Sequence, residues 1–138
     1  MVSFTSRNDS FNSPMKMNLN MTMLFVQDVT ALGRFYKDLF NMQVIEESPG
    51  WMVLQAGDGR IGLHRIGDHY TGDKPFKFDS NCKLVFDISE DLKAERSRLI
   101  AADVKMRELK TFDNYDYWVC DGEDPEGNVF ELRQRKVV

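Results

Sequence analysis

The sequence predicts an α+β fold built from two tandem β-α-β-β-β modules, and two observations support this fold class. The first half of the chain reads as a strand, a helix and three strands, and the second half repeats this order. The two halves align with a constant offset of 62 residues, so that Val26 corresponds to Ile88 and Met42 to Val104. Each module has one amphipathic helix for a whole sheet. We therefore expect the two sheets to bury their helix-facing sides and to share a concave face on the other side.

Module one is expected over residues 18–66. Asp28 is a good N-cap for a helix over residues 29–40, whose apolar side chains form a single stripe. Asn41 then predicts a left-handed end of this helix. Alternating apolar residues and intervening turns predict the strands of the module. These strands are expected over residues 19–26, 42–46, 51–56 and 60–66.

Module two is expected over residues 81–136, after a linker at residues 67–80 that is rich in Gly, Pro and Asp. A loop of this length can also be a lid or a partner contact. Ser89 is expected to cap a helix that runs through Ala102. Asp124, Pro125 and Gly127 form the last turn of the chain. The strands are expected over residues 83–88, 104–109, 115–121 and 129–133.

The composition is that of a single globular domain and argues against several classes of partner. The chain has 138 residues, of which 42% are hydrophobic and 29% charged, and its net charge is −4. This charge disfavours nucleic acid and anionic membrane surfaces, and no apolar run is long enough to span a membrane. Residues 1–17 are expected to form a flexible polar tail without the apolar segment of a secretion signal. Two cysteines are too few for a disulfide framework, so we expect a cytoplasmic protein.

Two motifs near the ends of the repeat resemble the signatures of a known family. Residues 25–28 (Phe-Val-Gln-Asp) with residues 35–40 (Phe-Tyr-Lys-Asp-Leu-Phe) resemble one signature, and residues 124–132 (Asp-Pro-Glu-Gly-Asn-Val-Phe-Glu-Leu) resemble another. The family is the glyoxalase/bleomycin-resistance/dioxygenase superfamily, also called vicinal oxygen chelate proteins, and the resemblance covers about residues 19–134. It implies paired modules that form a cupped, eight-stranded open sheet, commonly assembled as a homodimer.

The resemblance also implies where a divalent ion would bind, because metal-dependent members hold it with side chains from the first and last strand of each module. The corresponding positions here are Met21, Gly62, Lys83 and Glu131. Only Glu131 has a side chain that can coordinate such an ion. A thioether is a poor ligand for hard ions, glycine has no side chain and an ammonium has no lone pair. We therefore expect no metal and no other cofactor. Instead, we expect an ion pair between Lys83 and Glu131.

Strand alternation independently predicts the lining of the concave face, an apolar floor with a few polar groups, which is typical of small-molecule sites. Histidine is the side chain most suited to acid–base chemistry, so His64 and Glu131 are the candidates for catalysis, although His64 can also be a partly exposed strand histidine without a role. The predicted ligand-binding residues are Met21, Met23, Phe25, Arg60, His64, Lys83, Val85, Glu131 and Arg133.

These observations favour a protein that binds a small organic molecule in the cup without the metal centre of the family. The first alternative is a divergent lyase, isomerase or dioxygenase that uses His64 and Glu131, with a metal or with His64 as a base. The second alternative is an interaction module whose cup is filled by its own side chains. Fold alone does not identify the ligand.

Overall fold

The computed structural model describes residues 15–67 and 82–137. Most of the predicted tail and nearly all of the predicted linker therefore lie outside the described residues. In the described part of the tail, residues 15–17 are exposed and have no regular secondary structure. Within the described ranges, no helix is long and apolar enough to cross a membrane.

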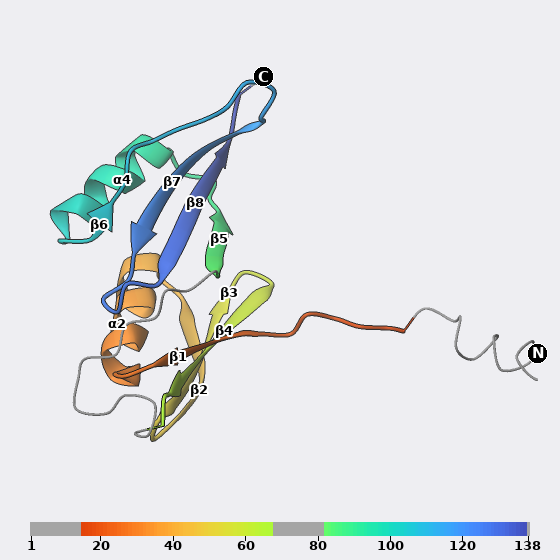
Figure 1. Cartoon of the computed structure of the whole chain (residues 1–138), viewed down its shortest axis with the longest axis vertical. Helices are drawn as coiled ribbons and strands as arrows, with labels where there is room; N and C mark the ends of the chain where they lie inside the picture. The colour runs from red at the N-terminus through yellow and green to blue at the C-terminus, as the bar shows by residue number, and fades with distance from the viewer. Residues whose placement is uncertain (1–14, 68–81, 138) are drawn as a thin grey trace, which may run out of the picture.

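Module one has the predicted order of elements and forms a four-stranded sheet (Figure 1). The order of strands in the sheet is β1-β4-β3-β2, with β1 parallel to β4 and the other neighbours antiparallel. The elements are β1 (Thr22–Val26), α2 (Val29–Phe40), β2 (Gln43–Ser48), β3 (Trp51–Ala56) and β4 (Gly59–Arg65).

Module two repeats this topology in a second four-stranded sheet, with the order β5-β8-β7-β6 and with β5 parallel to β8. The α+β class and the tandem modules are therefore confirmed. In the described residues, the eight strands are hydrogen-bonded as two sheets of four. The elements are β5 (Lys83–Asp87), α4 (Leu92–Ala101), β6 (Lys105–Met106), β7 (Tyr117–Glu123) and β8 (Val129–Arg135).

The ends of α2 are as predicted, whereas the start of α4 is not. Asp28 accepts a hydrogen bond from the backbone N–H of Ala31 at 3.0 Å, and Asn41 has a left-handed φ of 54°. In α4 the N-cap is Asp91 instead of Ser89, and its carboxylate accepts from the N–H of Ala94 at 3.1 Å. A carboxylate has the added advantage of a negative charge at the positive end of the helix dipole.

Strand β6 is much shorter than the predicted strand over residues 104–109. The ladder with β7 is interrupted at Arg107, whose backbone N–H still donates to Asp121 but whose carbonyl accepts from side chains. These donors are the guanidinium of Arg96 at 2.8 Å and the thiol of Cys120 at 3.2 Å. Because side chains bind the carbonyl that a strand neighbour would pair, the regular ladder stops there, and an isolated antiparallel bridge between Lys110 and Val119 follows.

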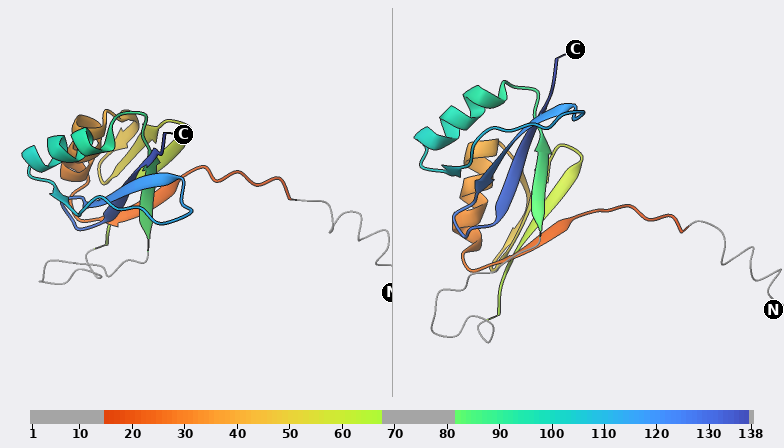
Figure 2. Two further views of the ribbon diagram at one scale, coloured as in Figure 1. Left: turned by 90° about the horizontal axis from the view of Figure 1, so that it is seen from above. Right: turned by 45° about the horizontal axis from the view of Figure 1, so that its top comes forward.

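Both helices lie on the same side of the two sheets (Figures 1 and 2). The helix of module one also packs against module two, since the ring of Phe40 lies 5.1 Å from that of Phe130 and 6.0 Å from that of Phe86. One hydrophobic core therefore runs through both modules. Side chains in or next to the strands that face the helices are buried or partly buried: Ile61, Leu63, Leu84, Phe86, Ile88, Phe130 and Leu132.

The turn before β8 joins the two modules through hydrogen bonds. The carboxylate of Glu126 accepts from the backbone N–H groups of Gln27 at 2.8 Å and of Asp28 at 2.9 Å. The buried carboxylate of Asp124 accepts from the hydroxyl of Tyr36 at 2.7 Å and from the backbone and side chain of Asn128. The motif that carries the family resemblance at this end of the chain therefore fixes the start of α2 against the last strand.

Candidate ligand-binding site

The predicted ligand-binding residues lie on the sheet faces opposite the helices, which we call the open faces. The exposed fraction of the residue is 41% for Met23, 50% for Phe25 and 49% for Val85. Their neighbours Leu24 and Leu84 are buried in the core. This alternation is what strands with one covered and one uncovered side produce.

The open face of module one carries an aromatic cluster of Phe25, Trp51 and His64. The ring of His64 lies 5.4 Å from that of Phe25 and 5.9 Å from that of Trp51, because these residues are paired across strands β1, β4 and β3. The Nδ1 atom of His64 lies 2.7 Å from the carbonyl oxygen of Arg65, so Nδ1 is the donor of this hydrogen bond. When the ring is neutral with the proton on Nδ1, Nε2 keeps its lone pair and can accept a proton or a hydrogen bond.

Met21 fills the space above Gly62 beside this aromatic cluster. A Cβ atom at Gly62 would lie 2.5 Å from the sulfur of Met21 and 3.2 Å from the ring of Trp51. Glycine at this position therefore allows the thioether to lie directly on the strand. The result is an apolar surface at two of the positions where the family resemblance implies metal ligands.

The open face of module two carries a charged cluster of Lys83, Arg107, Asp121 and Glu131. The ammonium of Lys83 lies 3.0 Å from Asp121 and 3.3 Å from Glu131, and Arg107 lies 3.5 Å from Asp121. The predicted ion pair between Lys83 and Glu131 is therefore present. The hydrogen bond to Asp121, followed by the other interactions with the two carboxylates, raises the pKa of Lys83 above its ordinary value, while partial burial opposes this shift.

The sequence analysis missed Arg107 and, more importantly for this cluster, Asp121. Its side chain is only 3% exposed, and its Oδ1 atom is buried without a hydrogen-bond partner among the described residues. It faces Glu131 directly across β7 and β8, a relationship that appears only once the strands are paired. The only signal in the sequence was a single acid in the otherwise uncharged segment 119–122 (Val-Cys-Asp-Gly).

The two predicted arginines lie in different surroundings. Arg60 donates to the side chain of Gln55 at 3.1 Å and lines a cavity of about 750 Å³ with Lys83 and Val85. This cavity lies between the β3–β4 hairpin and β5, so it brings residues of both modules together. Arg133 instead makes two hydrogen bonds with Asp87, at 2.6 and 3.2 Å, and its guanidinium lies 3.8 Å from the centre of the Tyr117 ring.

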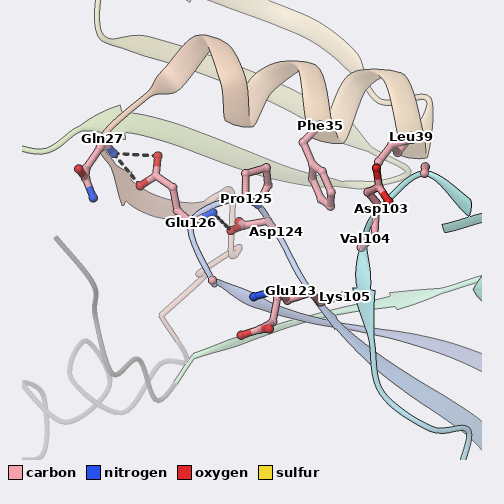
Figure 3. A pocket seen from close by; sticks show the side chains of 12 residues that line it. Gln27, Phe35, Leu39, Asp103, Val104, Lys105, Glu123, Asp124, Pro125 and Glu126 are labelled. Atoms are coloured by element: carbon pink, nitrogen blue, oxygen red, sulfur yellow. Dashed lines mark hydrogen bonds between the residues drawn. The ribbon is translucent and has the colours of Figure 1, made fainter. Parts of the chain in front are cut away.

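A second cavity, of about 550 Å³, lies beside the turn that joins the modules (Figure 3). It is lined by Phe35 of α2, by Val104 and Lys105, and by Glu123 and Pro125. The nearby carboxylate of Glu126 is directed at the backbone of Gln27 (Figure 3). None of the predicted ligand-binding residues lines this cavity, so we treat this region as part of the contact between the modules.

The residues present do not fit a divalent ion. Among the described residues, no group of three or more His, Cys, Asp or Glu side chains could hold one. At the positions implied by the resemblance, the sulfur of Met21 lies against Gly62, and the ammonium of Lys83 is bound to Glu131. One remaining carboxylate does not supply the three protein ligands that a catalytic zinc usually has.

Comparisons with known proteins agree with the observed fold. The family model described as the Glyoxalase/Bleomycin resistance protein/Dioxygenase superfamily matches residues 18–132. No curated protein matches the sequence significantly.

Several solved structures are similar to the chain. A lactoylglutathione lyase from Agrobacterium tumefaciens is 17% identical with a TM-score of 0.68, and the match covers 86% of this chain and 94% of that one. The fosfomycin resistance protein FosX from Listeria monocytogenes is 20% identical with a TM-score of 0.70, covering 89% and 97%. An integron cassette protein from V. cholerae is 21% identical with a TM-score of 0.69, covering 90% and 100%. At these identities the likeness shows a shared fold.

Proposed function

The chain belongs to the glyoxalase/bleomycin resistance protein/dioxygenase superfamily, and on this premise we propose that it binds a small organic molecule on its open faces without a divalent ion. The observation that carries this proposal is the ion pair between Lys83 and Glu131, 3.3 Å long. It directs the ammonium of Lys83 at the carboxylate that would otherwise be free to bind an ion. We place this binding function in the cytoplasm.

The chemistry of the open faces supports a ligand with both an apolar and a polar part. Phe25 and Met23 offer exposed apolar surface, and His64 can accept a hydrogen bond through Nε2. Lys83 and Arg60 line the same cavity and provide donors. Apolar surface combined with a few polar groups is the usual composition of a small-molecule site.

We further propose that the protein is a homodimer in which a second copy closes the cup. Support comes from the large apolar side chains that stay exposed on the open faces, Phe25 and Val85 among them. Large apolar side chains left exposed on one side of a protein are often covered by a ligand or a partner. Light scattering coupled to size-exclusion chromatography measures the assembly directly, and a monomer would contradict this part of the proposal.

An enzyme that uses His64 and Glu131 is the second candidate function. It is favoured by the tautomer of His64, whose free Nε2 is suited to accept a proton. The name lactoylglutathione lyase describes the protein from Agrobacterium tumefaciens. For the present chain it only suggests a class of reaction to assay. Turnover of a substrate that is abolished by His64→Gln would establish this candidate over the binding protein.

Ligand binding can be tested with a thermal-shift screen of aromatic, cationic and glycopeptide compounds, followed by calorimetry on each hit. A ligand at 100 times its Kd should add about 2.7 kcal/mol to the free energy of unfolding. Phe25→Ala should weaken binding at least about tenfold if the aromatic cluster contacts the ligand. Phe112→Ala removes a similarly exposed ring outside this cluster and should leave binding unchanged. Stabilisation by none of the compounds would count against the proposal.

A further inference from the structure

We propose that the ammonium group of Lys83 is a built-in cation, held by Asp121 and Glu131 in the place where a divalent ion would otherwise balance these carboxylates. Asp121 is then the residue that positions Lys83. The inference goes beyond the binding function, because it concerns how the charged cluster is balanced in the absence of any ligand.

The geometry shows two carboxylates that share one ammonium. Asp121 and Glu131 are direct neighbours across β7 and β8, and Lys83 lies within 3.0 Å of one and 3.3 Å of the other. A lysine ammonium has three donors, so it can bind both acids at once. Removing it would leave two like charges side by side on adjacent strands, an arrangement that destabilises a sheet, with only Arg107, 3.5 Å from Asp121, to balance them.

The burial of these groups makes the charge balance necessary. Asp121 is 3% exposed and Glu131 is 14% exposed, whereas Lys83 keeps 40% of its side chain exposed. A buried carboxylate without a cation is strongly unfavourable. The ammonium therefore lies at the surface of the cluster with the two carboxylates below it, which is where an ion arriving from solvent would bind.

The second, independent observation is the unsatisfied oxygen of Asp121. Its Oδ2 atom is shared by Lys83 and Arg107, while its Oδ1 atom is buried and has no partner among the described residues. Such a group costs free energy unless something binds it. Lys83 and Arg107 thus both bind Oδ2 and leave Oδ1 without a partner among the described residues, whereas a coordinated ion can be bound by both oxygens of a carboxylate.

The inference predicts that loss of the ammonium creates a binding site for a divalent cation. Without Lys83, Asp121 and Glu131 offer carboxylate oxygens of the type that Mn²⁺ prefers. Lys83→Met should therefore bind Mn²⁺ at least about tenfold more tightly than the wild type. About 1 mM MnCl₂ should raise the Tm of this variant by several degrees and leave that of the wild type unchanged.

Three further variants separate this explanation from a general effect of the substitution. Lys105→Met removes an exposed lysine of the same sheet and should behave like the wild type. Lys83→Arg retains the positive charge and should also gain no affinity for Mn²⁺. Lys83→Met combined with Glu131→Gln removes one carboxylate and should lose the gain.

The measurement is equilibrium dialysis of the full chain against MnCl₂, with the bound metal counted by mass spectrometry. If Lys83→Met does not give folded protein, Lys83→Gln serves as the second variant, since it also removes the charge but keeps a donor. A gain of Mn²⁺ binding in either variant supports the inference. Equal binding by wild type and variant, or no binding by any folded neutral variant, would overturn it. This test uses no organic ligand, so its outcome is separate from that of the binding proposal.

Discussion

The hydroxyl of Tyr36 donates a hydrogen bond of 2.7 Å to the carboxylate of Asp124, which joins the helix of module one to the last turn of module two. Both groups are buried, and burial together with the neighbouring carboxylate raises the pKa of Tyr36 far above its ordinary value. The two residues are 88 positions apart in the sequence. The contact therefore makes the stability of each module depend on the other.

Tyr36→Phe should lower the free energy of unfolding by about 1–3 kcal/mol, because it removes one donor from a buried carboxylate while keeping the ring. Urea denaturation measures this difference. Tyr117→Phe is the matched control, since its hydroxyl only accepts a long, exposed bond from Arg135 at 3.4 Å, and it should change stability by less than about 0.5 kcal/mol. Equal losses in the two variants would refute the structural role given to Tyr36.

Glu126→Ala should destabilise the protein by about 0.5–1.5 kcal/mol, the usual net contribution of a hydrogen bond, because it removes the acceptor for the backbone N–H groups just before α2. The carboxylate accepts from the backbone of both Gln27 and Asp28, and this arrangement leads directly into α2. Glu108→Ala, at a more exposed carboxylate paired with Arg96 at 3.4 Å, should have little effect. Denaturation followed by circular dichroism compares the two, and a neutral Glu126→Ala would show that this contact contributes nothing to stability.

Arg133→Met should raise the pKa of Asp87, which the hydrogen bonds from Arg133 hold below its ordinary value. A lowered carboxyl pKa in the folded state stabilises the protein above the pKa of the unfolded chain. This contribution is lost as the pH falls through the folded pKa. An NMR titration of the Asp87 carboxyl carbon between about pH 2 and 6 follows the change. Arg135→Met should leave the Asp87 titration as it is, and an identical curve for Arg133→Met would disprove the pairing.

Gly122→Ala should destabilise the protein by about 1–3 kcal/mol, because the new methyl group would overlap the ring of Phe130 in the core. An added Cβ would lie 2.5 Å from this ring and 2.5 Å from the sulfur of Met106. Gly62→Ala should cost less, since the sulfur of Met21, also 2.5 Å away, belongs to a side chain on the open face that can move. Thermal unfolding ranks the two variants, and a larger loss for Gly62→Ala would contradict this packing.

The sequence predicted most of the fold because its strongest signals are local. Asp28 and Asn41 mark the ends of α2, and alternation identifies the buried side chains of β4, β5 and β8. The wrong length of β6 has a different origin, because contacts from elsewhere in the chain determine where this strand ends. The short β6 depends on the side chains of Arg96 and Cys120, which bind the carbonyl of Arg107. Sequence alternation alone contains no information about those contacts.

The candidate site could be predicted only in part, because some of its contacts depend on the register between strands. The resemblance placed Lys83 and Glu131 at related positions, and chemical complementarity then predicted their ion pair. Predicting that Asp121 belongs to the site would have required the register between β7 and β8, which the sequence alone does not give. The packing of Met21 over Gly62 likewise depends on how β1 lies beside β4.

The metal content of the wild-type protein, purified without chelators and measured by mass spectrometry, tests the central claim most directly. The account predicts less than about 0.1 equivalent of zinc, nickel, iron or manganese per chain, since three protein ligands for a catalytic ion are lacking. One equivalent of a divalent metal, lost on His64→Ala or Glu131→Gln, would contradict it.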